Sequence, residues 1–481
     1  MKLKKIIGVL AAAGIAAPGV ALATNGMNME GYGPIATGMG GASMAYDNGV
    51  AAVMNNPATL GLMAEGNRVD LAVGGLHPDV TTNIMGMSAP SSGDAYYMPA
   101  AGWAQKRGKL AYGFGIFAQG GMGTEYGSTS ALSMGSGQPN RSEVGVGRAI
   151  VPLAYNVDPK LTIAGSIDFV WAGMDLQMLM SGGQFLGMAM GDPAAGGSVG
   201  GSMMTAFNGA VGMGLMNPNN PVNYGHFDFS NDNDYSGKAT ANGWAGKLGA
   251  TYKVNNQLTL GATYHSETDL GDLEGSATVA FNANLDTGIM SGGAPNGVYM
   301  AGTIPVTGKI AVRNFQWPET YGVGMAYQAT DRLMVAADYK RINWSKVMKN
   351  FQMTFTADGS PSNMSFANTQ LDATMYQNWD DQDVFQIGVS FKANDALTLR
   401  AGANLANNPI PNNTVNPLFP AIVKNHYTLG AGYAVSKAAD VNFSYSYAPK
   451  VTVNAPATVY SPGYSIDHAQ NNWQLMYSHR F

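Results

Sequence analysis

The sequence predicts an all-β membrane protein, an antiparallel transmembrane β-barrel of fourteen strands plugged by a small N-terminal hatch. Of its 481 residues only 12% are charged, about half the share found in soluble proteins. Beyond the N-terminal segment, no stretch offers the roughly 18 consecutive apolar residues that a membrane-spanning helix needs. From Arg68 onward, apolar residues alternate with small or polar ones, which is the pattern of strands. Only helices and closed barrels satisfy their backbone groups in lipid, so these observations favour a barrel.

Residues 1–23 are predicted to be a cleaved secretory signal. Three lysines open the segment, an apolar run follows from Ile6, and Ala21-Leu22-Ala23 forms a small-residue cleavage site. An uncleaved membrane anchor is the alternative, but glycine and proline interrupt the apolar run. The mature chain is therefore expected to begin near Thr24.

Charge and cysteine content narrow the function classes. Removing residues 1–23 takes away three lysines and no acidic residue, which changes the formal net charge from −5 to −8. Such a chain has no attraction for nucleic acid. The chain contains no cysteine, which excludes a disulfide framework, zinc–thiolate sites and thiol catalysis.

The hatch is predicted to span residues 24–66. Its central stretch, residues 33–62, holds six glycines, many alanines and the turn Asn55-Asn56-Pro57-Ala58. This composition favours a compact, close-packed plug over a long helix or a sheet.

The barrel is predicted to span residues 67–481. From Leu161 to Trp171 the odd positions are mostly large and apolar, whereas the even positions, among them Asp168, are small or polar. Because successive strand side chains face opposite sides, one face suits lipid and the other suits a lumen. The same alternation recurs around residues 321–327 and 441–448.

Short turns and long connections set the predicted strand count. Polar turns at 106–108, 157–159, 255–256, 330–331, 394–395 and 436–437 each join two alternating segments. The connections between them are long, at about 121–144, 176–237, 282–308, 357–378, 412–423 and 455–463. Short periplasmic turns opposite long external loops are typical of outer-membrane barrels. The resulting count is fourteen strands.

The last strand ends on Phe481 and places Trp473, Leu475 and Tyr477 at the same parity. A terminal aromatic strand resembles the signal read by the barrel-assembly machinery of bacterial outer membranes, although a chance aromatic ending is the alternative. The other predicted partners are outer-membrane lipid, lipopolysaccharide and a hydrophobic small-molecule ligand. The chain is expected to be a monomer.

Four charged residues are predicted to face the lumen. By parity these are Asp168, Asp338, Lys340 and Arg400. One interpretation is a set of paired or solvated charges that fix the barrel around its plug. The other is that Lys340 or Arg400 meets a polar or anionic group of a passing solute.

The connection at about 176–237 is rich in methionine. Methionine gives an adaptable apolar surface, and exposed apolar surface often marks a binding site. Two interpretations stay open: a loop that captures an apolar ligand, or short helices that bury their apolar sides on each other and on the barrel rim. The candidate capture residues are Met178, Met180, Phe185, Met203, Met204 and Phe207.

No motif for catalysis or metal binding emerges. The six histidines show no metal-ligand spacing. His265-Ser266 are adjacent strand residues that face opposite sides, which disfavours a nucleophile and base pair. The sequence therefore predicts no enzyme, no metal and no cofactor.

Ordered motifs along the mature chain resemble the FadL-type family of outer-membrane transporters for long-chain fatty acids and aromatic hydrocarbons. The stretch with Gly38, Gly40, Asp47 and Asn56-Pro57-Ala58 is similar to the hatch of that family. Further matches follow in order, at Tyr112-Gly113-Phe114-Gly115, Pro152, Trp317-Pro318-Glu319, Leu399-Arg400-Ala401-Gly402 and Leu429-Gly430-Ala431-Gly432-Tyr433. One departure is the leader TNGMNMEGY before the hatch, where the family has a hydrophobic N-terminal peptide.

The resemblance implies a fourteen-stranded barrel, a hydrophobic capture groove in the external loops and an inner site beside the hatch. It also implies that ligand leaves sideways at a kink in the third strand, for which Gly120-Gly121 is the candidate position. The predicted function is passive uptake of hydrophobic small molecules, either fatty acids or hydrocarbons, across the bacterial outer membrane. The alternative is a nonspecific aqueous porin or a structural surface barrel.

Overall fold

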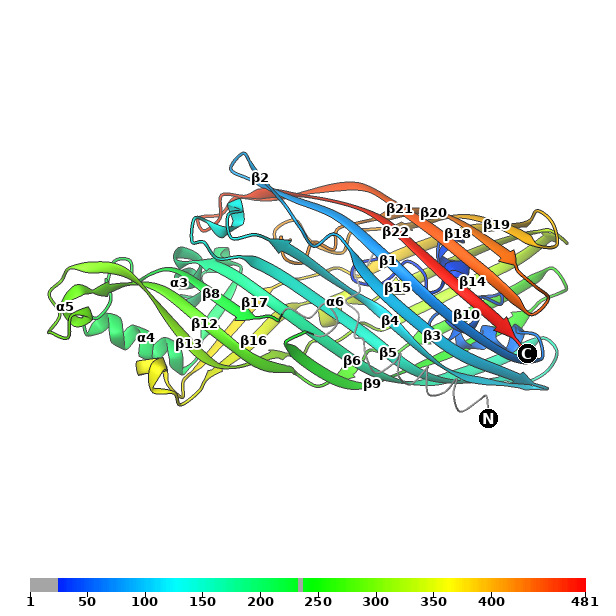
Figure 1. The fold of residues 1–481 in the computed structure, drawn as a ribbon, viewed down its shortest axis with the longest axis horizontal. Coiled ribbons are helices and arrows are strands. Elements are labelled where there is room, and N and C mark those ends of the chain that lie inside the picture. The colour runs from blue at the N-terminus through cyan, green and yellow to red at the C-terminus, as the bar shows by residue number, and fades with distance from the viewer. Residues whose placement is uncertain (1–24, 232–236) are drawn as a thin grey trace.

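The computed structural model describes residues 25–231 and 237–481, which form a long antiparallel barrel with an extension at one end (Figure 1). The predicted signal segment, residues 1–23, lies outside the described residues. The described strands belong to one sheet of 22 strands. Among the described residues, no helix is long and apolar enough to cross a membrane.

The barrel closes because the first strand pairs with the last. Arg68 of β1 is opposite Arg480 of β22, and their antiparallel pairing continues to Ile84 and Tyr464. The wall strands, in order of pairing, are β1 (Gly66–Ile84), β3 (Tyr96–Arg107), β4 (Leu110–Tyr126), β5 (Asn140–Asn156), β6 (Leu161–Ser181), β9 (Ala239–Lys253), β10 (Leu258–His265), β14 (Thr320–Thr330), β15 (Leu333–Ile342), β18 (Gln382–Lys392), β19 (Leu397–Ala406), β20 (Asn425–Ala434), β21 (Ala439–Ala455) and β22 (Tyr464–Arg480).

The predicted alternation of the wall is confirmed. On β6, Ile167 is 66% exposed on the outer face, whereas its neighbour Asp168 is fully buried on the inner face. Tyr321 and Val323 of β14 and Phe443 of β21 are also exposed outward. The six predicted short turns are confirmed as well, because each lies between two consecutive wall strands.

The predicted strand number is wrong. The sheet has 22 strands, eight of them outside the wall listed above, and two of these eight lie within residues 176–237, which were predicted to be a long external connection. These additional strands are β2 (Met87–Pro90), β7 (Gly197–Gly200), β8 (Val222–Phe229), β11 (Asp269–Leu270), β12 (Leu273–Asp286), β13 (Tyr299–Arg313), β16 (Asn350–Ala357) and β17 (Gln370–Tyr376). Several are short and rich in glycine, asparagine or aspartate, which are poor strand formers, so their pairing depends on neighbours that the local sequence does not reveal.

Most of these strands build the extension seen at the left of Figure 1. The pairing runs from β6 through β8, β12, β13, β16 and β17 to β7. Two helices, α3 (Gly182–Ala189) and α4 (Ser202–Gly212), lie beside it. The remaining helices outside the hatch are η3 (Ala131–Ser133), η4 (Pro193–Ala195), α5 (Thr287–Met290), α6 (Trp344–Val347) and η5 (Pro361–Phe366).

The hatch fills the barrel at the end that holds the C-terminus (Figure 1). It contains α2 (Pro34–Thr37), η1 (Val50–Val53) and η2 (Pro57–Leu62), and nearly all of its residues are buried. On one side its backbone touches the wall directly. A Cβ atom on Gly40 would lie 2.5 Å from the carbonyl oxygen of Ala403, and one on Gly402 would lie 2.2 Å from the amide nitrogen of Gly40. Only glycine permits this approach.

Candidate functional site

The wall is interrupted between β3 and β4. Their pairing runs from Arg107 and Leu110 up to Ala101 and Ile116. Within the described part of the chain, no pairing joins β3 to β4 beyond that point, although both strands continue. The interval closes again near the other end, where the Ser92 amide donates to the Glu125 carbonyl at 2.9 Å. We call this interval, between residues 96–100 and residues 117–124, the window.

Beside the window β4 carries a bulge. Ala118 pairs with Gly147 of β5 and Gly120 pairs with Val146, so Gln119 is the extra residue. A bulge bends its strand and interrupts the regular pairing. The irregularity therefore lies one residue before the Gly120-Gly121 position implied by the resemblance.

The N-terminal leader takes the place of the missing strand partner at the window. Asn28 forms a β-bridge with Gly120, and the Gly121 amide donates to the Met27 carbonyl at 3.1 Å. A Cβ atom on Gly120 would lie 2.0 Å from the Met27 carbonyl oxygen, so this contact requires glycine. The side chain of Asn28 also accepts a hydrogen bond of 2.7 Å from the Trp317 indole.

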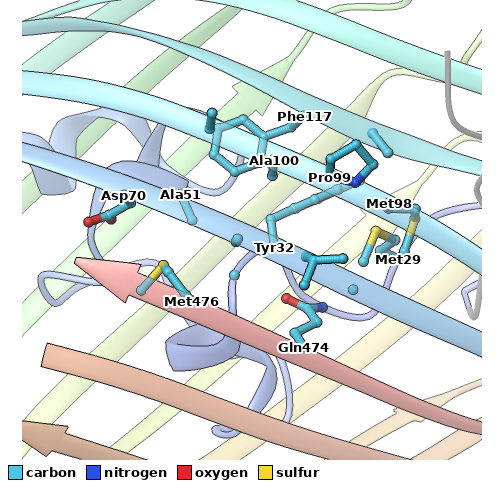
Figure 2. A pocket seen from close by; sticks show the side chains of 16 residues that line it. Met29, Tyr32, Ala51, Asp70, Met98, Pro99, Ala100, Phe117, Gln474 and Met476 are labelled. Carbon is cyan, nitrogen blue, oxygen red and sulfur yellow. The ribbon is translucent and has the colours of Figure 1, made fainter. Parts of the chain in front are cut away.

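An apolar cavity lies behind the window, between the hatch and the wall (Figure 2). Met29, Tyr32 and Ala51 of the hatch line it together with Met98 of β3 and Phe117 of β4. Its free volume is about 30 Å³, roughly the share that one water molecule has in the liquid. A hydrophobic ligand therefore enters only if the flexible methionines or the hatch move, which methionine side chains readily permit.

A second cavity opens among the loops at the opposite end of the wall. Met178 and Met180 of β6 line it with Leu418, Tyr460 and Tyr464. Its volume is about 220 Å³, and an apolar cavity of about 150 Å³ is enough to hold benzene. We call this cavity the outer groove.

The six candidate capture residues separate into two groups. Met178 and Met180 line the outer groove. The other four are buried in the packing between the helices and the extension, where the rings of Phe185 and Phe207 lie 6.1 Å apart and Phe185 lies 5.5 Å from Phe281. Met203 and Met204 are 0% and 8% exposed. Of the six, the structure therefore places the first pair at the outer groove.

The hatch residues singled out in the sequence contact the wall or cap a helix. The Asn56 amide donates to the carbonyls of Met44 and Ala250, at 2.8 and 3.2 Å, and its oxygen accepts from the Ala58 amide at 3.1 Å as the N-cap of η2. Pro57 is the first residue of that helix, where its missing amide hydrogen costs nothing. Asp47 lies 3.7 Å from Arg68.

Three of the four lumen charges have polar partners inside the barrel. Asp168 pairs with Arg148 at 2.8 Å and with Lys247. Asp338 accepts hydrogen bonds from the amides of Ser43 and Met44 in the hatch, at 2.6 and 3.1 Å. Arg400 donates to Asn442 at 3.0 Å.

Lys340, the fourth, is two residues from Asp338 on the same face of β15. Neither Lys340 nor Arg400 lines the apolar cavity or the outer groove. The arrangement of these charges matches the structural interpretation better than solute recognition.

The sequence missed the residues that form the apolar cavity. Met29 and Tyr32 belong to the leader and the start of the hatch, and the alternation of β3 and β4 did not distinguish Met98 and Phe117 from other wall residues. The methionines of the leader were the available signal. Among the described residues, no cluster of three or more metal-ligating side chains was found.

Comparison with known proteins gives a consistent result. The profile of the family described as "Outer membrane protein transport protein (OMPP1/FadL/TodX)" matches residues 9–480. The crystal structure of the toluene transporter TodX from P. putida is 31% identical, with a TM-score of 0.78 over 94% of this chain and 99% of that one. The toluene transporter TbuX from Ralstonia pickettii is also 31% identical, with a TM-score of 0.72 over 94% and 99% of the two chains.

Two further matches are more limited. A FadL homologue from Pseudomonas aeruginosa shares 16% identity at a TM-score of 0.65, over 95% of this chain and all of that one, and shows the fold alone. An uncharacterised protein of Chlorobium limicola is 53% identical over 72 residues, so this chain covers 36% of that protein. The resemblance to FadL-type proteins is confirmed: the chain belongs to the OMPP1/FadL/TodX family of transport proteins and resides in the bacterial outer membrane.

Proposed function

We propose that this outer-membrane channel takes up hydrophobic small molecules, with monoaromatic hydrocarbons as its preferred solutes. The solute enters the outer groove, moves to the apolar cavity beside the hatch, and leaves through the window between β3 and β4 into membrane lipid. The observation that carries this proposal is the interrupted β3–β4 pairing with an apolar cavity directly behind it.

The physical argument rests on where an apolar solute is stable. Burial of apolar surface stabilises the solute by about 25 cal/mol for each Å² removed from water. An exit into lipid keeps the solute away from water, whereas an axial exit past the hatch would meet the polar contacts of Asn56 and Asp338. Uptake is passive, because the solute's own gradient supplies the driving force.

Two features favour a monoaromatic solute over a fatty acid. The outer groove has room for one aromatic ring, and two tyrosines line it. Neither of the two cationic residues considered for a carboxylate, Lys340 and Arg400, lines the apolar cavity or the outer groove. The toluene transporters TodX and TbuX are both 31% identical to this chain.

The other predicted partners are those that a protein in the outer membrane meets. The outward apolar face contacts outer-membrane lipid, and the loops around the outer groove lie at the level of lipopolysaccharide. Phe481 is 55% exposed at the end of β22, which makes it accessible to the barrel-assembly machinery.

Uptake into proteoliposomes tests the proposal. Labelled toluene, labelled hexadecanoate and a labelled neutral sugar are compared in vesicles with and without the protein. We expect faster toluene entry with protein that saturates with concentration, slower entry of hexadecanoate, and no added entry of sugar. Equal entry of sugar and toluene would instead support a nonspecific porin.

A further inference from the structure

Residues 407–424, between β19 and β20, fold into the barrel instead of standing above it. We call this segment the in-folded loop. The sequence predicted an external connection at about 412–423, but its apolar side chains are covered by the wall and by neighbouring loops. The buried residues are Ile410, Val415, Leu418, Ala421, Ile422 and Val423.

Side chains of the wall strands β4, β5 and β22 hold the backbone of this loop. From β4, Thr124 and Tyr126 donate to the Pro417 carbonyl at 2.9 and 3.1 Å. The Ser142 hydroxyl of β5 donates to the carbonyl of Leu418.

The strand β22 supplies two further contacts. The Tyr464 hydroxyl donates to the Val415 carbonyl at 2.7 Å. His468 Nδ1 lies 2.8 Å from the Pro420 carbonyl oxygen. The loop therefore runs from β19 and β20 to the part of the wall formed by β22, β1, β3, β4 and β5.

The order of residues along the strands fixes the level of the loop. On β22, Gln474 lines the apolar cavity, His468 holds the loop, and Tyr464 both holds it and lines the outer groove. On β4, Phe117 lines the apolar cavity, and Thr124 holds the loop seven residues farther on. A strand rises about 3.3 Å per residue, so the ten residues from Gln474 to Tyr464 separate the two cavities by about 33 Å along β22, with the loop between them.

The loop also forms part of the outer groove. Asn416, Pro417 and Leu418 line it opposite Met178 and Met180. A solute in the outer groove therefore contacts the segment that separates it from the apolar cavity.

We propose that the in-folded loop is an inner gate, which must release its contacts with Thr124, Tyr126 and Ser142 before a solute passes from the outer groove to the apolar cavity. This inference rests on the proposed function. The loop has no regular secondary structure, and its described anchors are mostly hydrogen bonds from wall side chains. Segments held in this way open locally at lower cost than the wall strands.

The in-folded loop is anchored to β4, the same strand that borders the window. Thr124 and Tyr126 belong to the half of β4 that has lost its pairing with β3. Release of the in-folded loop therefore removes contacts from the same segment that borders the window, so that opening the gate loosens the exit.

A reversible cross-link tests the gate. The protein contains no cysteine, so Ser142→Cys with Leu418→Cys gives a single pair that oxidation joins. We expect the oxidised variant to transport toluene at least tenfold more slowly than the reduced form of the same variant, and a reductant to restore the rate. The matched control is Asn282→Cys with Thr303→Cys, which are register partners in the extension and should transport equally in both states.

A loosened gate gives an independent test that does not require the disulfide to form. Tyr126→Phe with Ser142→Ala removes two of the donors, and toluene uptake should rise two- to fivefold. Tyr445→Phe is the control, because its hydroxyl contacts Asn471 on the outer face of the wall.

The two proposals fail in different ways. Wild-type protein that does not transport toluene would refute the proposed function. Wild-type transport that neither the cross-link nor the loosened contacts alter would refute the gate alone.

Discussion

The hydroxyl of Tyr32 donates a hydrogen bond of 2.7 Å to the backbone carbonyl of Gln119, which joins the hatch to the bulged residue of β4. Burial raises the pKa of Tyr32 above its ordinary value, so the hydroxyl keeps its proton and stays a donor. Tyr32 also lines the apolar cavity. This one contact therefore links the plug, the cavity and the border of the window.

Replacing Tyr32 by phenylalanine removes this hydrogen bond and keeps the ring. A typical buried hydrogen bond contributes about 0.5–1.5 kcal/mol, so the bulged segment should leave the hatch more often. We expect toluene uptake to rise about two- to tenfold and the Gly121 amide to exchange faster with deuterium. Tyr112→Phe, which changes a hydroxyl on the outer face, should alter neither quantity. An unchanged Gly121 exchange rate in Tyr32→Phe would show that the contact does not hold the window.

Asn56 anchors the hatch to the wall, and Asn56→Ala should loosen the plug without opening the barrel. The change removes two donor contacts and a helix N-cap, and loss of an N-cap alone costs about 1 kcal/mol. We expect entry of bulky hydrophilic dyes into proteoliposomes, with resistance of the folded barrel to SDS unchanged.

The control for this hatch variant is Asn220→Ala. Asn220 lies in an exposed connection before β8, and its replacement should leave the vesicles tight. Tight vesicles with Asn56→Ala as well would mean that the other hatch contacts, such as those of Asp338, suffice to hold the plug.

Sequence patterns predicted the wall far better than the loops. Ile167 and Asp168 are correctly assigned to opposite faces because a strand between lipid and lumen repeats every two residues. The strands of the extension escaped prediction because segments such as Gly197–Gly200 have no such pattern and depend on partners distant in sequence. The alternation pattern did not reveal the window, because the window consists of missing pairs, which local sequence does not record; only the family resemblance pointed to it, at Gly120-Gly121.

Prediction of the candidate site residues also failed where their surroundings depend on the tertiary fold. Met178 was proposed for ligand capture and lines the outer groove, whereas Phe185, proposed with it, is fully buried against Phe207 and Phe281. Both are apolar residues in a methionine-rich stretch. Their surroundings differ because Phe185 lies on α3, which packs its side chain into the protein core. Composition alone does not reveal this packing.

Arg400→Ala tests whether the charge of Arg400 recognises the carboxylate of a solute. Arg400 is held by Asn442 and lines neither cavity, so we expect toluene uptake to change less than twofold and hexadecanoate uptake to change equally little. Phe117→Ser serves as the comparison, because it places a hydroxyl in the apolar cavity and should slow toluene severalfold. A selective loss of hexadecanoate uptake in Arg400→Ala would assign Arg400 to carboxylate recognition.

Tyr460 lines the outer groove, and its hydroxyl donates a hydrogen bond of 2.7 Å to the carboxylate of Asp192. This hydrogen bond lowers the pKa of Asp192 below its ordinary value of 3.8. Its contribution is therefore fully present above that value and is lost as the pH falls through the lower pKa of the folded protein.

Toluene bound at the outer groove should consequently dissociate faster only at strongly acidic pH in the wild type. In Tyr460→Phe it should dissociate severalfold faster at every pH, because this hydrogen bond is absent throughout. Asp192→Asn keeps an acceptor and removes the titration. A wild-type dissociation rate that equals that of Tyr460→Phe at neutral pH would show that the contact between Tyr460 and Asp192 does not retain toluene.

Passage through the window is the central claim, and one cross-link tests it most directly. Ala100→Cys with Phe117→Cys would join β3 to β4 where their pairing has ended, one step beyond Ala101 and Ile116. Arg107→Cys with Leu110→Cys is the control, because these residues are already partners at the closed end. We expect oxidation of the first variant to reduce toluene uptake into proteoliposomes at least tenfold, with recovery on reduction, and oxidation of the control to change nothing. Undiminished uptake through the sealed window would contradict lateral exit and favour a route along the barrel axis.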